Sequence, residues 1–175
     1  LTVAKDLNIK YIRYERATAL LPEYEKLMIV ESYHQAAKVA GTFGNNIFLT
    51  TGSKTLDVFL NEPSLKDKNI TVRVLPSVEV ITKCQVAGLT AKNIVALQGP
   101  FSHELNLELY KKYQAEVIIT KNSGIIGGTD TKISAAISLN LPIIMIARPK
   151  IEYINKVNTF EAVLQLLNNK NGDEN

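Results

Sequence analysis

Five short apolar runs stand out along the chain, each bounded by polar or turn-forming residues. All but the run ITVRVLP are near-continuously apolar at their centres. Apolar runs of this length are typical of strands that are buried on both faces of a parallel sheet. We therefore predict five strands, over Ile47–Gly52, Ile70–Pro76, Ile94–Pro100, Glu116–Lys121 and Pro142–Arg148.

Segments with a helical pattern lie between and around these runs. In one of them Leu105, Leu109 and Tyr113 recur every four residues, which predicts a stripe that faces the core. Strands that alternate with helices predict an α/β fold, here a doubly wound, mainly parallel five-stranded sheet with helices on both faces, like a Rossmann lobe. The expected helices are Ser32–Ala40, Lys54–Leu60, Val78–Ala87, His103–Ala115, Gly128–Leu139 and Thr159–Leu167.

The start of the chain reads as the tail of a helix followed by a strand, so we expect the sequence to enter a fold partway. The expected organisation is a remnant of an N-terminal lobe with its linker over residues 1–28 and an α/β lobe over residues 29–170. Residues 171–175 are polar and predict a frayed tail.

Composition narrows the class of protein. Hydrophobic residues make up 46% and charged residues 21% of the chain, which is ordinary for a soluble globular domain. The net charge is only +3, and no block of lysine or arginine exceeds a pair, so neither nucleic acid nor an anionic membrane is an expected partner. No apolar run approaches the roughly 20 residues of a membrane span, and no signal peptide is visible.

The chain has one cysteine, Cys84, which excludes an internal disulfide. A small apolar role in the core is the simplest prediction for it. Reduced thiols fit a cytoplasmic location. No spacing of His, Cys and carboxylate residues suggests a metal site.

Ligands of open α/β sheets bind outside the carboxyl ends of the strands. We call this side of the sheet the carboxyl edge. The loops that leave the predicted strands there carry the chain's unusual residues, whereas the loops that enter the strands are plainer. We therefore expect the functional site at the carboxyl edge.

The longest of these loops lies in the stretch ITKNSGIIGGTDTKISAA. Its lysines and the N–H groups of the following helix would suit an anion, and its glycines permit close backbone approach. The spacing matches neither a Walker loop nor the G-x-G-x-x-G fingerprint. An ordinary turn with a helix cap at Thr129 or Asp130 is an equally good interpretation.

Two other loops at this edge have the same two interpretations. TTGSKT, with Thr51, Gly52 and Lys54, could face a phosphate or carboxylate, although a capped helix start explains it somewhat better. QGPFSHELN combines a Gly-Pro turn, an exposed aromatic residue and an N-cap at Ser102. Glu104 could act as an acid or base, but a first-turn glutamate is also good helix electrostatics.

Histidines and arginines add further candidates. His103 lies at the same helix start, and a solvated role is the more ordinary one; His34 is expected on the surface. Arg13 and Arg148 occur at strand positions that could aim a guanidinium at a carboxylate, which arginine binds through two hydrogen bonds. A half-exposed strand explains the YIRYER pattern equally simply.

Taken together, these motifs resemble the precorrin-6A or cobalt-precorrin-6A reductases of cobalamin biosynthesis. The matching segments are IKYIRYER, IFLTTGSKTLDVF, VRVLPSVE, ALQGPFSHELN, VIITKNSGIIGGTDTKISAA and LPIIMIARP, in family order. The resemblance implies an oxidoreductase that transfers a hydride from NADPH or NADH to one double bond of the macrocycle. It also implies two α/β lobes with a ligand cleft between them, in a fold like that of uroporphyrinogen III synthase.

The sequence departs from the family pattern in two ways. Most of the first lobe, with its glycine-rich nucleotide loop, is missing, so we expect the chain alone to be weakly active or inactive. Asn122 also stands where an acidic residue is common. A lyase-type tetrapyrrole enzyme of the same fold and a non-catalytic tetrapyrrole- or nucleotide-binding fragment are the alternatives.

The resemblance implies a tetrapyrrole substrate ringed with carboxylates. We also expect a monomer or weak homo-oligomer without nucleic acid or membrane partners. Basic residues would hold the substrate, and the protein would mainly orient the nicotinamide. No catalytic residue is assigned; the candidates for a proton donor are His103, Glu104, Lys121 and Tyr14. The expected cofactor- or substrate-binding residues are Arg13, Arg16, Thr51, Gly52, Lys54, Gly99, Pro100, Phe101, Ser102, Lys121, Ser123, Gly124, Gly127, Gly128, Thr129, Lys132 and Arg148.

Overall fold

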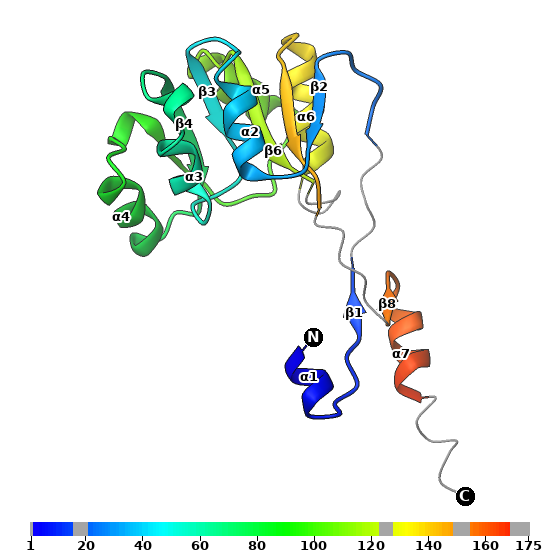
Figure 1. The fold of residues 1–175 in the computed structure, drawn as a ribbon. Coiled ribbons are helices and arrows are strands. Elements are labelled where there is room, and N and C mark those ends of the chain that lie inside the picture. Colours follow the sequence, from blue (N-terminus) through cyan, green and yellow to red (C-terminus); the bar gives the residue numbers. More distant parts are fainter. Residues whose placement is uncertain (1, 16–20, 123–127, 149–154, 169–175) are drawn as a thin grey trace, which may run out of the picture. The chain divides into compact units, whose positions relative to one another are not determined.

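A computed structural model describes residues 2–15, 21–122, 128–148 and 155–168 (Figure 1). The chain divides into two compact units, which are described separately. The larger unit spans residues 18–149, and the smaller one joins residues 1–17 to residues 150–175. The lobe boundaries expected from the sequence stay a prediction.

The larger unit is built on a parallel sheet, which confirms the α/β class (Figure 1). Its six strands lie in the order β2-β7-β6-β3-β4-β5. All five predicted strands are present. The strands are β2 (Leu27–Val30), β3 (Asn46–Leu49), β4 (Asn69–Val74), β5 (Ile94–Ala96), β6 (Val117–Lys121) and β7 (Ile143–Ile146).

The predicted strand count is one too low because the sequence pattern missed β2. This strand pairs with β7 alone and forms one edge of the sheet. It is four residues long, and Ile29 at its third position is 57% exposed. A short edge strand between charged residues lacks the long apolar run that marks a central strand.

Helices cover both faces of the sheet, as predicted. One core cluster contains residues of α2 (Tyr33–Ala40), α3 (Leu56–Leu60) and α4 (Val78–Val86). The other contains residues of α5 (His103–Lys112) and α6 (Thr129–Ser138). Successive strand residues alternate between the clusters. Two 3-10 turns, Pro63–Leu65 and Ala91–Asn93, precede β4 and β5.

The predicted apolar stripe of α5 is partly wrong. Leu109 and Tyr113 do pack against the core, but Leu105 is 42% exposed. The fully buried positions include Asn106 and Tyr110, whose ring lies edge-on to Phe48. A polar residue replaces the expected leucine because the amide of Asn106 bonds a buried guanidinium, described below.

The direction of the crossovers reverses between β3 and β6. From β3 the chain moves through α3, β4 and α4 to the far edge strand β5. From β6 it moves through α6 to β7 on the opposite side. Ligands of doubly wound sheets bind at the carboxyl edge beside such a switch point. We therefore expect a ligand site at the carboxyl ends of β3, β6 and the adjacent β4.

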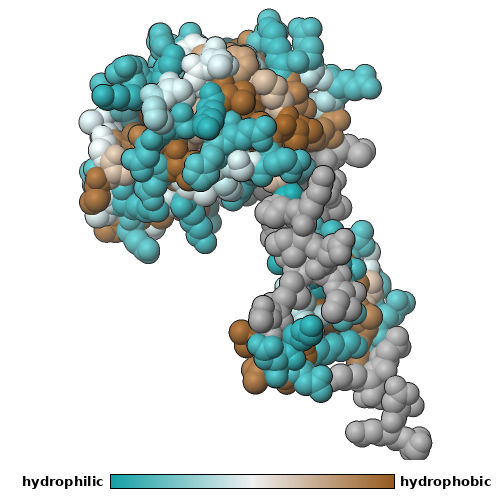
Figure 2. All heavy atoms as spheres, viewed as in Figure 1, coloured by the Kyte–Doolittle hydropathy of each residue, from teal (hydrophilic) through white to brown (hydrophobic). Residues whose placement is uncertain are grey.

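The smaller unit consists of a short parallel ladder and two helices. Its elements are α1 (Thr2–Asp6), β1 (Arg13–Tyr14), β8 (Lys156–Val157) and α7 (Phe160–Asn168), with β1 paired to β8. The ring of Tyr14 stacks on Phe160 at 5.0 Å. The unit exposes apolar side chains on its surface (Figure 2), namely Val3, Leu7, Ile9, Phe160, Leu164 and Leu167.

Within the described ranges, no helix combines the length and the apolar character that crossing a bilayer requires.

Candidate functional site

Buried polar side chains gather at the carboxyl edge, on the face that α5 and α6 cover. Leu49 of β3 pairs with Val72 of β4 and with Ile119 of β6. The next positions in these registers place Arg73, Thr50 and Thr120 in one row across the three strands. The backbone N–H of Thr50 continues the ladder by donating to Ile119 O at 2.8 Å. Because side chains alternate between faces, this row points to the same side as Phe48.

Arg73 is the central residue of this region. Its side chain is only 5% exposed. Nη1 donates to Asn106 Oδ1 at 2.7 Å, and the guanidinium carbon lies 4.1 Å from the ring centroid of Phe101. Nη2 is buried and has no hydrogen-bond partner. Burial lowers the pKa of Arg73, but a guanidinium keeps its charge inside proteins.

Asn106 fixes the orientation of Arg73. It is fully buried on α5, and its Nδ2 donates to Ser102 O at 2.8 Å and to Thr131 Oγ1 at 3.4 Å. The amide can therefore present only its oxygen to the guanidinium. Ser102 in turn is the N-cap of α5, as predicted, since its hydroxyl accepts from the N–H of Leu105 at 3.2 Å. The start of α5 thus holds the arginine in place.

Lys132, in the first turns of α6, adds a second buried cation. Its side chain is 8% exposed. Burial, together with the nearby charges of Arg73 and Lys121, lowers its pKa to about 8, and Asp130 opposes this shift. No Asp or Glu among the described residues is buried. Two buried cations, Arg73 and Lys132, therefore lie in this region.

Threonine hydroxyls in the same region are also buried without a bonded neighbour. They belong to Thr120, at the end of β6, and to Thr51 and Thr55, in the loop after β3. A buried polar group without a partner costs about 1–3 kcal/mol and calls for an explanation. Unpaired donors at a ligand-binding edge are explained if a ligand supplies the acceptor.

The start of α6 differs from the prediction. Neither Thr129 nor Asp130 caps the helix; Gly128 occupies the N-cap position, with φ of 66° and no side-chain cap. Such a left-handed conformation favours glycine, which explains its place there. Thr129 is the first helical residue and is fully buried.

Several predicted site residues follow strands at the carboxyl edge, and one of them, Phe101, contacts Arg73. Phe101 covers the guanidinium instead of being freely exposed, and the Gly99–Pro100 bond before it is cis. Lys121 is exposed at the end of β6. Nε of Arg148 donates to Asn122 O at 2.8 Å, so this arginine holds the backbone that follows β6.

In the loop after β3, Gly52 has φ of 83°, and Lys54 is exposed. The helix predicted to start at Lys54 runs over Leu56–Leu60, and Thr55 is its N-cap residue.

Two candidates for a proton donor are also at this edge. His103 Nδ1 and Ser134 Oγ share a hydrogen bond of 2.8 Å, which links α5 to α6. Glu104 is exposed, and hydrogen bonds from its own backbone N–H and from Ser102 lower its pKa. A carboxyl with a lowered pKa is ionised at neutral pH and is a poor proton donor.

The structure does not relate the remaining predicted residues to this region. Arg13 and Tyr14 belong to the smaller unit, where both are exposed. Arg16, Ser123, Gly124 and Gly127 lie outside the described residues.

Sequence reasoning missed Arg73, Asn106 and Thr120. One signal was available: Arg73 is a charged residue inside a β-branched run, where a buried charge needs a special reason. Nothing in the local pattern of Asn106 distinguished it from an ordinary polar residue in a first helical turn.

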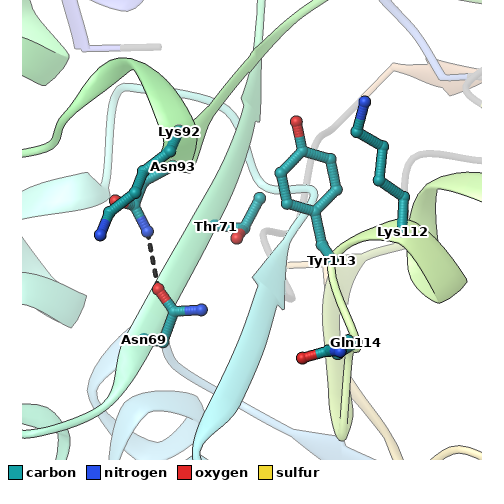
Figure 3. Close-up of a pocket in the computed structure, with 7 residues that line it drawn as sticks. All are labelled: Asn69, Thr71, Lys92, Asn93, Lys112, Tyr113 and Gln114. Atoms are coloured by element: carbon teal, nitrogen blue, oxygen red, sulfur yellow. Dashed lines mark hydrogen bonds between the residues drawn. The ribbon is translucent and has the colours of Figure 1, made fainter.

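A polar hollow also exists at the amino-terminal ends of the strands, opposite the carboxyl edge (Figure 3). Thr71 and Tyr113 lie between Asn69 and Asn93 on one side and Lys112 on the other, and Asn93 donates to Asn69 at 2.8 Å. The hollow lies where strands β4, β5 and β6 begin, so it is distinct from the region around Arg73. Within the described ranges, no group of three or more His, Cys, Asp or Glu residues could hold a metal ion.

Comparison with known proteins gives consistent matches. The family model described as precorrin-6x reductase CbiJ/CobK matches residues 1–168. A cobalt-precorrin-6A reductase from Priestia megaterium is 46% identical over 168 residues, which are 95% of this chain and 66% of that protein. The cobalt-precorrin-6A reductase of Methanococcus maripaludis is 40% identical over 95% of this chain and 63% of its own length.

A solved structure of a CobK precorrin-6A reductase has the same fold. It superimposes with a TM-score of 0.75 and 22% identity, over 96% of this chain and 65% of that chain. The chain thus spans about two thirds of the length of these relatives. Since the family model matches nearly all of it, the chain belongs to the precorrin-6x reductase family, CbiJ/CobK.

Proposed function

We propose that this chain is the larger part of an enzyme that reduces one double bond of the precorrin-6A or cobalt-precorrin-6A macrocycle, with NADPH or NADH as the reductant. The family match over residues 1–168 is the observation that carries the proposal. The cationic carboxyl edge supports it, because both the macrocycle, with its carboxylates, and the nucleotide, with its phosphates, are polyanions.

The residues at the edge fit an anionic nucleotide or macrocycle. Thr51, Thr55 and Thr120 offer buried hydroxyls without partners, and Arg73 offers a buried N–H. When bound, the reduced nicotinamide supplies the hydride. The residues of this chain then hold the anionic groups, orient the reacting faces and exclude water.

Apolar side chains beside Arg73 suit the body of a large ring. Leu75 follows β4 and is 57% exposed, and Leu97 follows β5 and is 39% exposed. The N–H of Leu97 donates to Val74 O at 3.0 Å, so the two strand ends lie next to each other. The proton that must follow the hydride remains unassigned among His103, Lys121 and Tyr14, and Glu104 is the least suited because its pKa is lowered.

We further expect a monomer or weak homo-oligomer that works in the cytoplasm. The buried thiol Cys84 supports a reducing compartment, since it serves as a small core residue of α4. Sedimentation at several protein concentrations tests the oligomeric state.

A chimera tests the function. In it, residues 1–168 of this chain replace the matching segment of the Priestia megaterium relative. We expect the chimera to oxidise NADPH or NADH, followed by loss of nucleotide absorbance, only when precorrin-6A or its cobalt form is added under anaerobic conditions. A folded chimera that oxidises neither nucleotide contradicts the proposal. Conversion of the macrocycle without nucleotide oxidation favours a lyase.

A further inference from the structure

We propose that Arg73, Asn106, Thr120, Lys132 and Phe101 form a pocket for one oxyanion, a carboxylate or phosphate group of the ligand. We call these residues the oxyanion pocket. The inference deepens the proposed function and rests on it only in taking the ligand to be an anionic small molecule.

Two buried cations contribute to the electrostatics of the pocket. Arg73 and Lys132 are 5% and 8% exposed, and the charge of Arg73 lowers the pKa of Lys132. Two like charges removed from water repel each other and lose hydration. A bound oxyanion is attracted by both charges at once.

The geometry of Arg73 leaves one donor for a ligand. One edge of its fork is occupied, because Nη1 donates to Asn106 at 2.7 Å. Phe101 covers the plane of the guanidinium at 4.1 Å. Nη2 remains buried and without a partner. The side chain is thus held by two neighbours while one donor stays available, which is the arrangement of a preorganised anion receptor.

Thr120 supplies a second unpaired donor. It is fully buried in the same row as Arg73, and its hydroxyl has no hydrogen-bond partner. Valine would fill the same volume without a polar group to satisfy. A hydroxyl at this position is explained by an acceptor that arrives with a ligand.

The exposed side chains of Leu75 and Leu97 lie beside the pocket and indicate what the rest of the ligand is like. A charged group held below an apolar rim suits a molecule with an apolar body and an anionic substituent. A propionate or acetate arm of a tetrapyrrole and a phosphate of a nicotinamide nucleotide both present such an oxyanion, and they are distinguished by experiment.

Binding measurements on the 175-residue chain test the pocket. The probes are pyrophosphate and NADPH for the phosphate source, and uroporphyrin, a porphyrin with carboxylate arms, for the carboxylate source. Lys132→Gln removes one buried charge, and its matched control is Lys92→Gln, an exposed lysine at the opposite edge. Thr120→Val removes the buried hydroxyl, and its matched control is Thr71→Val, a buried threonine on β4.

We expect Lys132→Gln to weaken one class of probe about tenfold or more, and Thr120→Val to weaken the same class about threefold or more. Both controls should change the dissociation constant less than about twofold. Weakening confined to pyrophosphate and NADPH assigns the pocket to a phosphate, and weakening confined to uroporphyrin assigns it to a carboxylate.

Several results overturn the proposal. They are an equal loss in the matched controls, no loss for any probe, or no binding of any probe up to about 10 mM. Arg73→Gln is a further variant, but it can fail to fold, so the decision rests on Lys132→Gln and Thr120→Val, with circular dichroism to verify the fold. The chimera described above separates the two ideas: an active chimera in which Lys132→Gln and Thr120→Val leave probe binding unchanged sinks the pocket alone, and an inactive chimera whose pocket binds anions sinks the reductase alone.

Discussion

Lys132 makes the oxyanion pocket sensitive to pH. Its pKa of about 8 means that the ammonium is largely protonated at pH 7 and largely neutral at pH 9. The charged groups close to it are Arg73, Lys121 and Asp130. Arginine does not lose its charge in this range, so the pH response of the pocket belongs to the lysine.

We predict that affinity for an anion falls as the pH rises through about 8. Sulfate is a suitable probe, because its own charge is constant over this range. Binding should be nearly independent of pH below 7 and weaken by up to about tenfold per pH unit above 8, as expected when one proton must be bound. Calorimetric titration from pH 6 to pH 10 measures this. Lys132→Gln should give weaker binding and a flat profile; a sloping profile in that variant would contradict the assignment to Lys132.

The same lysine is predicted to lower the stability of the ligand-free fold. Its pKa falls from 10.5 in the unfolded chain to about 8 in the folded protein, so the unfolded state binds more protons between these values. Stability therefore rises with pH from about 8 to 10.5, and the full cost is present below pH 8. Lys132→Met should raise the free energy of unfolding at pH 7 by about 1–3 kcal/mol.

Urea denaturation at pH 7 and at pH 10.5 measures this difference. The gain should shrink at the higher pH, where the lysine is neutral in both states. Saturating anion should shrink the gain at pH 7 by about 1.4 kcal/mol, because the variant pocket binds anion about tenfold more weakly than wild type. If Lys132→Met is less stable than wild type at pH 7 without anion, the buried ammonium stabilises the fold and the prediction is wrong.

At the scale of elements, Gly128 sets the start of α6 and so the position of Lys132. Its φ of 66° is left-handed, and so is the φ of 92° at Gly88, which follows α4. Alanine in this conformation costs about 1–2 kcal/mol. We predict that Gly128→Ala and Gly88→Ala lower the free energy of unfolding by similar amounts in urea. Only Gly128→Ala should also weaken anion binding, by about threefold or more. Equal anion affinity in both variants would contradict a role for this helix start.

The elements that the sequence predicts best are those with a local signal. The central strands β3, β6 and β7 are visible because burial on both faces requires apolar residues throughout, and Ser102 is visible because a helix start needs a cap. Strand β2 was not visible, since one side of it is exposed. Thr51 and Lys132 were predicted because they lie in, or just after, loops at the carboxyl edge. Arg73 was missed because its role depends on Asn106, 33 positions away along the chain.

At the scale of the whole molecule, the smaller unit has little core of its own. No residue of α7 is buried, and Phe160, Leu164 and Leu167 are 70%, 58% and 52% exposed. These residues recur at helical spacing, and an apolar stripe on a helix is stabilised when another element covers it. The chain spans 66% of the Priestia megaterium relative, so the chimera contains further elements that could provide the cover.

We therefore predict that the apolar stripe of α7 stabilises the chimera but not the 175-residue chain. Leu164→Lys should leave the melting temperature of the chain nearly unchanged and lower that of the chimera by several degrees, because burying a leucine contributes about 1.5–3 kcal/mol. The matched control is Val86→Lys, at a position of α4 that is 83% exposed, which should have little effect in either protein. Thermal unfolding of all four variants, followed by circular dichroism, separates the cases. If Leu164→Lys also leaves the melting temperature of the chimera nearly unchanged, no element of the chimera covers the apolar stripe of α7, and the prediction is wrong.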